Sequence, residues 1–226
     1  MSFSNNFIKG MMFSGFYITS YLLNCETLWF DPLYDSWDDP LYDPLHNNES
    51  FDYDKTAYYP ILNLWKKQTV LFFDDLHESK NVRRILKNYE LRINYDFKTI
   101  LNNIIDYHGN IWITPPFQKA LIELSKQNGK TKALSFEVYK NGELKAGEIG
   151  IKTGKIYTSY SGFYNESSAG SVQLLMMLKY LRDNDYAFCN FGTDDSEKNN
   201  AYKKKLGAVY IDRNDFIEIW RKGRNL

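Results

Sequence analysis

The hydrophobic and polar positions of the chain are most regularly spaced in residues 154–192. They predict a strand at residues 155–160, a polar turn at 161–169, an amphipathic helix at 170–182 and a second strand at 187–191. Five apolar residues of the predicted helix recur at spacings of three and four and share one face: Val172, Leu174, Leu175, Leu178 and Leu181. A helix with one apolar face packs on a sheet, so we expect a parallel unit of strand, helix and strand.

Two short segments follow the carboxyl ends of these two strands. They are residues 160–163 (YSGF) and residues 190–193 (NFGT). In open sheets with parallel strands, ligands bind at the carboxyl ends of the strands. We therefore expect the functional site where these two segments meet.

The same analysis predicts secondary structure on both sides of this unit. Gly109 and Gly129 are expected to end helices, and Asn141-Gly142 is expected to form the two-residue turn of a hairpin. The predicted helices lie within residues 7–17 and at 79–87, 96–107, 114–127 and 199–206, and the further predicted strands lie at 69–73, 91–94, 134–140, 144–151 and 208–212. The strands from residue 134 to residue 160 then form an antiparallel meander that leads into the parallel unit.

The charge of the chain is balanced overall, with 28 basic and 28 acidic groups, but it is unevenly distributed. Residues 10–54 carry nine acidic groups and no Lys or Arg, which leaves 27 basic and 19 acidic groups, a net charge of +8, for residues 55–226. A phosphate-rich partner requires a positive surface, although an ordinary solvated surface can carry the same excess. The charge distribution therefore leaves nucleic-acid binding open.

The densest group of cations lies on the predicted helix at residues 79–87. The pattern directs Val82, Ile85 and Leu86 inward, and it leaves four cations on the more exposed faces: Lys80, Arg83, Arg84 and Lys87. A solvated helix face and a face that contacts phosphates both fit this pattern.

Residues 31–54 differ in composition from the rest of the chain. The sequence Asp-Pro-Leu-Tyr occurs at residues 31–34 and again at 39–42, and a third Asp-Pro pair follows at 43–44. Three prolines, each preceded by aspartate, exclude a long helix. We expect an acidic, aromatic loop that is either a lid or internal competitor for the basic surface, or a solvated insertion, and we favour the insertion.

The chain has two cysteines and three histidines, at scattered positions: Cys25, Cys189, His46, His77 and His108. They form no disulfide framework and no metal-ligand spacing, which favours a reducing compartment and a protein without a metal site. The uncharged run at residues 10–23 is too short to span a bilayer and lacks the cleavage site of a secretory signal. We therefore expect a cytoplasmic protein with no membrane partner.

Several short segments occur in an order that points to a known family. They are residues 112–114 (WIT) before a predicted helix, 135–138 (SFEV) and 147–150 (GEIG) in the predicted hairpin, 161–163 (SGF), and 206–208 (LGA). In their order and spacing they resemble the leucyl/phenylalanyl-tRNA-protein transferases. Upstream, residues 82–84 (VRR) are similar to the basic helix of that family and residues 15–17 (GFY) to its N-terminal turn. The resemblance covers nearly the whole chain except the loop at residues 31–54.

The resemblance implies an α+β fold of the N-acetyltransferase-like (GNAT) kind, in which helices flank a mixed sheet and a smaller α/β region precedes it. We expect residues 1–95 to form the N-terminal region, which includes the acidic loop at 31–54 and the basic helix at 79–88. Residues 96–226 are expected to form the acyltransferase domain.

The resemblance also implies an activity. Members of the family take Leu or Phe from a charged tRNA and join it to the N-terminus of a protein that begins with Arg or Lys, which marks that protein for degradation as an N-degron. The expected partners are aminoacyl-tRNA and the N-terminus of an acceptor protein. Aminoacyl-tRNA is then a co-substrate, no cofactor or metal is expected, and we expect a monomer.

The family's binding residues can be carried over by position. The pocket for the apolar aminoacyl group and the terminal adenosine is expected to include Trp112, Phe163, Leu174 and Phe188. The tRNA-binding face is expected to include Arg83, Arg84 and Lys87. Without the resemblance, simple core packing explains each of the four pocket residues.

The sequence departs from the family at the catalytic positions. Where the family has a glutamate followed by serine, this chain has Tyr160 and Ser161, and where the family has an Asp-x-Gln sequence, this chain has Asn190-Phe191-Gly192. We expect Tyr160 or Ser161 to join a proton relay, Asn190 to orient the amine or the ester carbonyl, and Asp194 to replace the missing carboxylate. Alternatively, Tyr160 only fills space and Asn190 only caps a loop.

These departures leave three functional hypotheses. The first is an aminoacyl-tRNA-dependent transferase with altered acceptor specificity. The second is an acetyl-CoA-dependent N-acetyltransferase on the same fold, for which the turn at residues 165–170 (NESSAG) supplies a single glycine to approach a pyrophosphate. The third is a non-catalytic homologue that binds tRNA.

Overall fold

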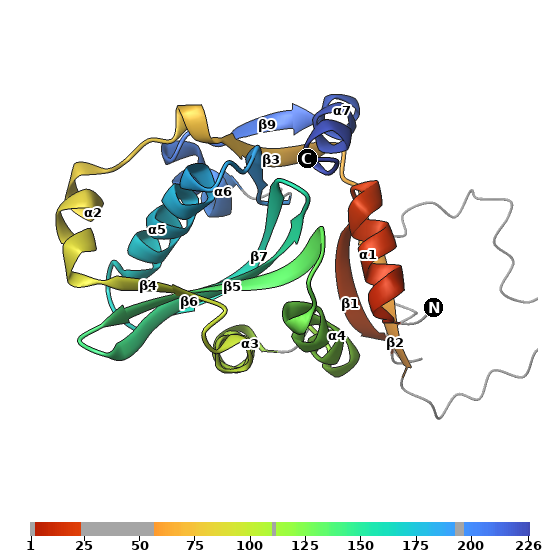
Figure 1. The fold of residues 1–226 in the computed structure, drawn as a ribbon, viewed down its shortest axis with the longest axis horizontal. Helices are drawn as coiled ribbons and strands as arrows, with labels where there is room; N and C mark the ends of the chain where they lie inside the picture. Colours follow the sequence, from red (N-terminus) through yellow and green to blue (C-terminus); the bar gives the residue numbers. More distant parts are fainter. Residues whose placement is uncertain (1–2, 24–56, 110–111, 193–196) are drawn as a thin grey trace, which may run out of the picture.

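The computed structural model describes residues 3–23, 57–109, 112–192 and 197–226. Within these ranges the chain forms a seven-stranded sheet and a two-stranded sheet with helices around them (Figure 1). The loop predicted at residues 31–54 and the candidate residue Asp194 lie outside the described residues. The elements in chain order are α1 (Asn5–Ser14), β1 (Tyr17–Leu23), β2 (Ala57–Asn63), β3 (Lys67–Phe72), the 3₁₀ turn η1 (Phe73–Asp75), α2 (Lys80–Ile85), the 3₁₀ turn η2 (Leu86–Asn88), β4 (Glu90–Ile93), α3 (Phe97–His108), α4 (Pro115–Lys126), β5 (Thr131–Lys140), β6 (Glu143–Thr153), β7 (Ile156–Tyr164), α5 (Ala169–Asp183), β8 (Phe188–Asn190), α6 (Glu197–Lys205), β9 (Val209–Asp212) and α7 (Arg213–Gly223).

The strand order of the large sheet is β4-β5-β6-β7-β8-β3-β9. Strands β5 to β7 form the predicted antiparallel meander, and β4 extends it by pairing with β5. Strands β7 and β8 run parallel and are joined by the predicted crossover helix α5. The hairpin between β5 and β6 turns at Asn141 and Gly142, whose φ angles of 52° and 81° are the positive values that a two-residue hairpin turn requires. The prediction of an α+β fold with a mixed sheet flanked by helices is confirmed.

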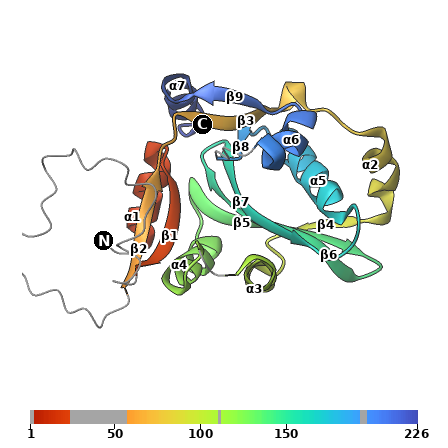
Figure 2. The ribbon, with the colours of Figure 1, turned by 180° about the vertical axis from the view of Figure 1, so that it is seen from behind.

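Different helices cover the two faces of this sheet (Figure 2). Helix α5 packs on the face that carries Leu134, Phe136 and Tyr157. Helices α3 and α4 pack on the opposite face, which carries Ile151 and Tyr160, and α1 and α7 extend the same apolar cluster. Because side chains alternate along a strand, the neighbouring strand residues Ile156 and Tyr157 belong to different clusters.

Strand β7 is longer than the sequence predicted. We expected it to end at Tyr160, with a polar turn after it, but the strand continues to Tyr164. Residue 161 pairs with Ile149 and residue 159 pairs with Gly150, so Tyr160 is the extra residue of a β-bulge. The turn predicted for residues 161–164 is therefore wrong. The long neighbouring strand β6 offers backbone partners as far as Ala146, and this pairing outweighs the local preference of polar residues for a turn.

The N-terminal part of the chain contributes to both sheets. Helix α1 ends at Gly15, where φ is 96°, as the sequence predicted. Strands β1 and β2 were not predicted, and they pair so that Pro60 lies opposite Ser20 in a two-stranded sheet that tolerates a proline. Strands β3 and β4 precede residue 96 and yet belong to the large sheet. The boundary that we placed between residues 95 and 96 therefore does not coincide with a break in the sheet.

Candidate active site where strands β7 and β8 separate

Strands β7 and β8 are paired over a short distance and then separate. Their last paired residues are Thr158 and Asn190. Beyond this pair β7 follows β6 to Tyr164, whereas β8 ends at Asn190. A point where neighbouring parallel strands separate is where open sheets bind ligands. The two segments that the sequence singled out lie on either side of this point, which we take as the candidate active site.

Tyr160 points toward the N-terminal helix and is buried. Its hydroxyl oxygen accepts a hydrogen bond from the backbone N–H of Ile18 at 3.2 Å and lies 3.4 Å from the sulfur of Met12. Its ring stacks on Tyr17 at a centroid distance of 4.4 Å and lies 6.1 Å from the ring of Trp112. Burial raises the pKa of the Tyr160 hydroxyl far above its ordinary value. Packing accounts for these contacts, and the proposed relay through Tyr160 stays a prediction.

Replacing Tyr160 with Phe tests the packing interpretation. The variant leaves the buried N–H of Ile18 without its acceptor, so we expect the free energy of unfolding to fall by about 1 to 3 kcal/mol. Tyr164→Phe, at a residue that is 50% exposed, is the control and should change stability by less than about 0.5 kcal/mol. Urea denaturation of both variants measures the difference. Equal stabilities would contradict the structural assignment of the Tyr160 hydroxyl.

Asn190 is buried at the end of β8. Its side-chain Oδ1 accepts a hydrogen bond from the backbone N–H of Gly192 at 3.0 Å, which is the local loop cap considered from the sequence. Gly192 has a φ of 69°, and a Cβ there would lie 3.3 Å from the rings of both Tyr17 and Trp65. Ser161 is half-buried in β7. Catalytic roles for Asn190 and Ser161 stay predictions.

The four predicted pocket residues are divided between the two faces of the sheet. Phe163 and Phe188 belong to the cluster on the side of α3 and α4, and the half-buried Trp112 packs against it. Leu174, on α5, belongs to the cluster on the other face. The structure therefore does not bring all four side chains together, and their part in binding stays a prediction.

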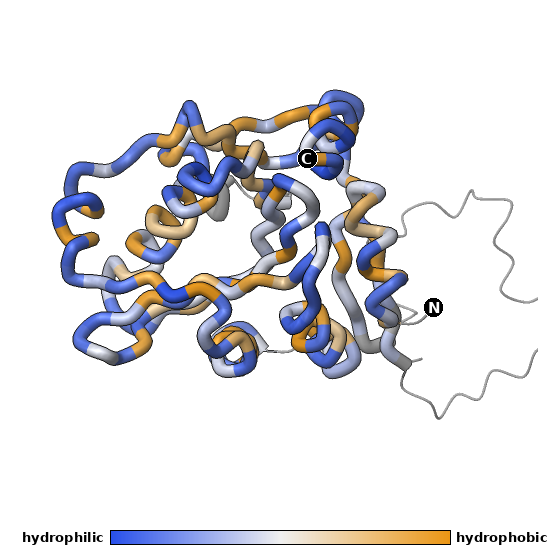
Figure 3. The backbone as a smooth tube through the Cα atoms, in the orientation of Figure 1, coloured by the Kyte–Doolittle hydropathy of each residue, from blue (hydrophilic) through white to orange (hydrophobic). Residues whose placement is uncertain are grey.

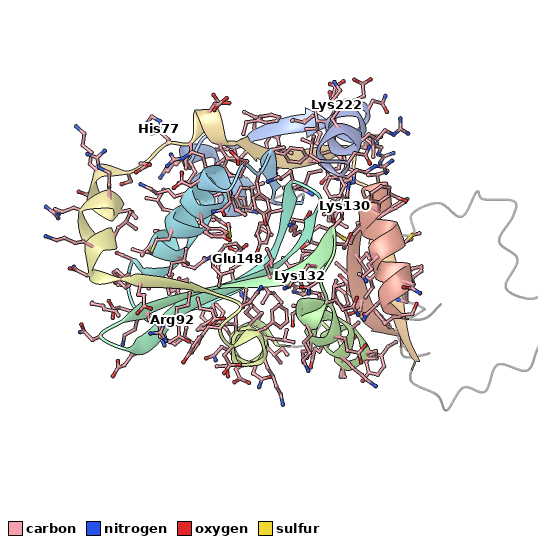
Figure 4. The ribbon with its side chains drawn as sticks, in the orientation of Figure 1. His77, Arg92, Lys130, Lys132, Glu148 and Lys222 are labelled. Carbon is pink, nitrogen blue, oxygen red and sulfur yellow. The ribbon has the colours of Figure 1, made fainter. Side chains whose placement is uncertain are left out.

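A buried carboxylate on the α5 face was not among the predicted site residues. Glu148 of β6 is 5% exposed and lies near the middle of the molecule, whereas Arg92, His77 and Lys222 lie at its edges (Figure 4). Its carboxylate accepts a hydrogen bond from Gln173 Nε2 at 3.3 Å, and the Tyr157 hydroxyl lies at 3.5 Å. The hydroxyl group of Ser159, two residues from Tyr157 on β7, acts in the same direction as these two groups and lowers the pKa of the carboxyl group. We call these four residues the Glu148 cluster: Glu148, Tyr157, Ser159 and Gln173.

Gly150 is what allows Tyr157 to reach this cluster. A Cβ on Gly150 would lie 2.4 Å from both Cζ and the hydroxyl oxygen of Tyr157, and 2.3 Å from the backbone oxygen of Thr158. The tyrosine ring therefore crosses β6 directly over the glycine, with its hydroxyl toward Glu148 two residues away. Gln173 reaches the cluster from α5, where it lies on the buried face of the helix.

Burial is the main influence on the charge of Glu148, and it raises the pKa of the carboxyl group from 4.5 to about 7. The Ser159 hydroxyl, a hydrogen bond from Gln173, the positive charge of Lys203 and a hydrogen bond from Tyr157 act in the opposite direction. Burial, reinforced by the Glu148 charge, raises the pKa values of Tyr157 and Cys189. The carboxylate thus titrates near neutral pH between groups that stay protonated.

A signal for Glu148 was present in the sequence. It is an acidic residue inside a strand predicted for the middle of the meander, and an acid that a sheet buries is costly unless it is paired or functional.

The predicted basic helix has the expected orientation. Val82, Ile85 and Leu86 pack inward against the small cluster that includes Val138 and Val172. In Figure 3 hydrophilic and hydrophobic residues alternate along this segment, as expected for a helix with one buried side. The cations are exposed: Lys80, Arg83, Arg84 and Lys87. Their binding of tRNA stays a prediction.

Two features are absent from the described ranges. None of the helices there combines the length and hydrophobicity that a membrane span requires. Among the residues whose positions are described, no three His, Cys, Asp or Glu side chains gather as metal ligands.

Comparison with known proteins identifies relatives of the chain. A family described as leucyl/phenylalanyl-tRNA protein transferase matches residues 70–221. A leucyl/phenylalanyl-tRNA--protein transferase of Campylobacter lari is 29% identical over 153 residues, which are 68% of this chain and 67% of that protein. The protein of the same name from Flavobacterium johnsoniae is 31% identical over 179 residues, which are 73% of this chain and 81% of that protein.

The similarity to solved structures is weaker. FemX superposes with a TM-score of 0.44 at 10% identity and covers 65% of this chain and 60% of that one. L-PGS from Bacillus licheniformis superposes with a TM-score of 0.41 at 11% identity, over 71% of this chain and 66% of that one.

The family match runs from β3 into α7. It therefore includes the basic helix, the separation of β7 and β8, and the Glu148 cluster. The chain belongs to the leucyl/phenylalanyl-tRNA protein transferase family.

Proposed function

We propose that the protein transfers Leu or Phe from a charged tRNA to the N-terminus of an acceptor protein, in the cytoplasm and without a further cofactor. The observation that carries this proposal is the family match over residues 70–221, which spans the candidate active site. The altered acceptor specificity that we propose rests on Tyr160 and Asn190, which put neutral side chains where the family resemblance led us to expect carboxylates.

The reaction is the attack of an amine on an ester. A C–N bond forms at the aminoacyl carbonyl, the C–O bond to the ribose breaks, and the proton lost by the amine ends on the released ribose oxygen. Catalysis requires that the amine is held close to the carbonyl, that a group accepts the proton and that donors stabilise the oxyanion. We assign adenosine stacking to Trp112, which is half-buried beside Tyr160.

Specificity for the acceptor follows from charge. A cationic N-terminal residue binds best beside a carboxylate, and neither Tyr160 nor Asn190 supplies one. We therefore expect a preference for acceptors that do not begin with Arg or Lys.

An aminoacyl-transfer assay tests this function. The protein is incubated with labelled Leu-tRNA or Phe-tRNA and with peptides that begin with Arg, Lys, Asp or Glu. We expect labelled product, with Arg and Lys peptides as the poorer acceptors. If product is absent in all combinations, the proposal fails. Acetyl-CoA that raises the melting temperature would then favour the acetyltransferase, and tRNA binding without turnover would favour the non-catalytic homologue.

The tRNA-binding face is tested by reversing two charges on α2. Arg83→Glu with Arg84→Glu should weaken tRNA binding and reduce the slope of log affinity against log salt concentration by roughly 2, because each lost phosphate contact removes about 0.9. The matched control is Lys119→Glu with Lys126→Glu, which makes the same charge change at exposed residues of α4. Filter binding at several salt concentrations measures both. An equal loss in the two variants would show only a general charge effect and would contradict the assignment.

A further inference from the structure

We propose that Glu148 is the proton acceptor of the transfer reaction and that Ser159 relays the proton to it from the attacking amine. This inference rests on the proposed function and supplies the carboxylate that the sequence lacks at Tyr160 and Asn190. It replaces our expectation that Asp194, which lies outside the described residues, compensates for that loss.

The position of Glu148 carries the first step of the argument. Glu148 lies on β6 and is paired across the sheet with Gly162, and the next residue, Ile149, pairs with Ser161. The carboxylate therefore belongs to the strand beside the bulge at Tyr160, three residues from Ile151, which pairs with the last residue of β7 that is paired with β8. A bulge beside such a separation is a common way for proteins to direct side chains at an active site.

Ser159 links the buried carboxylate to the separation of the strands. Glu148, Tyr157 and Gln173 are at most 5% exposed, whereas Ser159 is half-buried. Ser159 pairs with Gly150, two residues from Glu148 on β6, and lies directly before the bulge residue. Of the four residues in the Glu148 cluster, Ser159 is the most exposed, and we therefore assign the contact with the amine to it.

The chemistry of the cluster favours a proton acceptor over a structural group. The other side chains of the Glu148 cluster are all neutral. A buried carboxylate with such partners is destabilising when ionised, whereas a neutral residue of similar size would avoid that cost. The aromatic hydroxyl of Tyr160, by contrast, accepts a hydrogen bond from backbone and is surrounded by apolar side chains.

The proposed step neither gains nor loses a proton overall. As the C–N bond forms, the amine proton moves to Ser159 Oγ and the Ser159 proton moves to the Glu148 carboxylate. As the C–O bond to the ribose breaks, the same path returns the proton to the departing ribose oxygen. Glu148 ends ionised and Ser159 ends as the hydroxyl, so no oxidant, metal or cofactor is consumed.

The proposed acceptor has to be ionised at the start of each turnover. Burial places its pKa at about 7, so the pH profile of the transfer rate should contain an inflection near that value, in addition to the inflection from the amine of the peptide. The groups that face the carboxylate are Tyr157 from β7, Cys189 from β8 and Lys203 from α6, in addition to the neutral Gln173 from α5. Tyr157 and Cys189 stay protonated in this range because burial raises their pKa values.

The test is single-turnover transfer from Leu-tRNA or Phe-tRNA to the best peptide acceptor, measured between about pH 5.5 and 9 for wild type and Glu148→Gln. We expect the variant to lose about 100-fold to 10,000-fold in rate at saturating peptide with little change in KM, and to lose the inflection near pH 7. The free amine titrates at about 7.7 to 8.0, so the same peptide must be used for both proteins. Glu148→Asp should recover part of the rate.

Glu137→Gln is the matched control. Glu137 is also a buried glutamate of the meander, but its carboxylate accepts hydrogen bonds from the backbone N–H of Asp96 and the hydroxyls of Ser135 and Tyr139, and so joins β5 to the start of α3. We expect this variant to be less stable and to keep the pH dependence of transfer.

The outcomes separate the inference from the proposed function. Product from the wild type with an unchanged rate and inflection in Glu148→Gln overturns the inference and leaves the function standing. A wild type that makes no product overturns both. If circular dichroism shows that Glu148→Gln does not fold, Ser159→Ala decides, because an unchanged rate in that variant removes the relay.

Discussion

Replacing Gly150 with Ala is expected to destabilise the fold by about 3 kcal/mol or more, and to be among the most damaging single methyl additions in the chain. The added Cβ would lie 2.3 Å from the backbone oxygen of Thr158 and 2.4 Å from the Tyr157 ring. A backbone atom in a paired strand cannot move away as a flexible side chain can, so β6 and β7 must separate locally. Urea denaturation followed by circular dichroism measures the loss.

Gly10→Ala is the matched control for this variant. Gly10 lies within α1, and a Cβ there would have no atom within 4 Å. Because glycine is a poor helix former, alanine should stabilise the protein by up to about 1 kcal/mol. If Gly150→Ala were as stable as this control, the close crossing of Tyr157 over β6 would be wrong, and with it the path of the Tyr157 hydroxyl to Glu148.

Replacing Glu148 with Gln is expected to raise the free energy of unfolding at pH 8 by roughly 3 kcal/mol relative to wild type. Any hydrogen bond of the carboxylate that the amide cannot form reduces this gain. This increase in the free energy of unfolding follows from the difference between the ordinary carboxyl pKa of 4.5 and the value of about 7 that burial imposes in the folded protein. Glutamine keeps a similar shape and avoids a buried charge. The protein would thus be more stable in the variant that we expect to be slower.

The direction of the pH dependence follows from the same pKa. Below pH 4.5 the Glu148 carboxyl is protonated in both the folded and the unfolded protein, so it does not reduce stability. As the pH rises from 4.5 to about 7, the unfolded chain releases its proton first, so the stability of wild type falls, and above about 7 the loss is complete. The difference between wild type and Glu148→Gln should therefore be small near pH 4.5 and largest near pH 8.

Denaturation of both proteins at several pH values measures this dependence. Glu218→Gln removes one carboxylate from an exposed position of α7 and should change stability by less than about 0.5 kcal/mol. A Glu148→Gln variant that shows the same difference from wild type at acid and alkaline pH would mean that the folded carboxyl titrates normally, and hence that it is not buried as described.

Residue spacing alone was sufficient for most elements that carry a strong local signal. The periodic leucines of α5, the Asn141-Gly142 turn and the glycine after α1 each act through local geometry, so the sequence indicates them directly. Strands β1 and β2 carry no such signal, because their pairing joins segments that are far apart in the chain. Long-range pairing also decided the length of β7, whose last residues are polar and were predicted as a turn.

For the candidate site, too, some features follow from the sequence and others only from the tertiary structure. The sequence by itself determined the family, the α+β class and the two segments between which we place the candidate site, because these depend on the order and spacing of residues along the chain. Only the tertiary structure decided which side chains meet there. Tyr160 faces the aromatic residues of the N-terminal region, and Glu148 lies beneath α5 with Ser159 and Gln173. The bulge and the burial of a charge arise from contacts between distant segments, and local patterns do not encode such contacts.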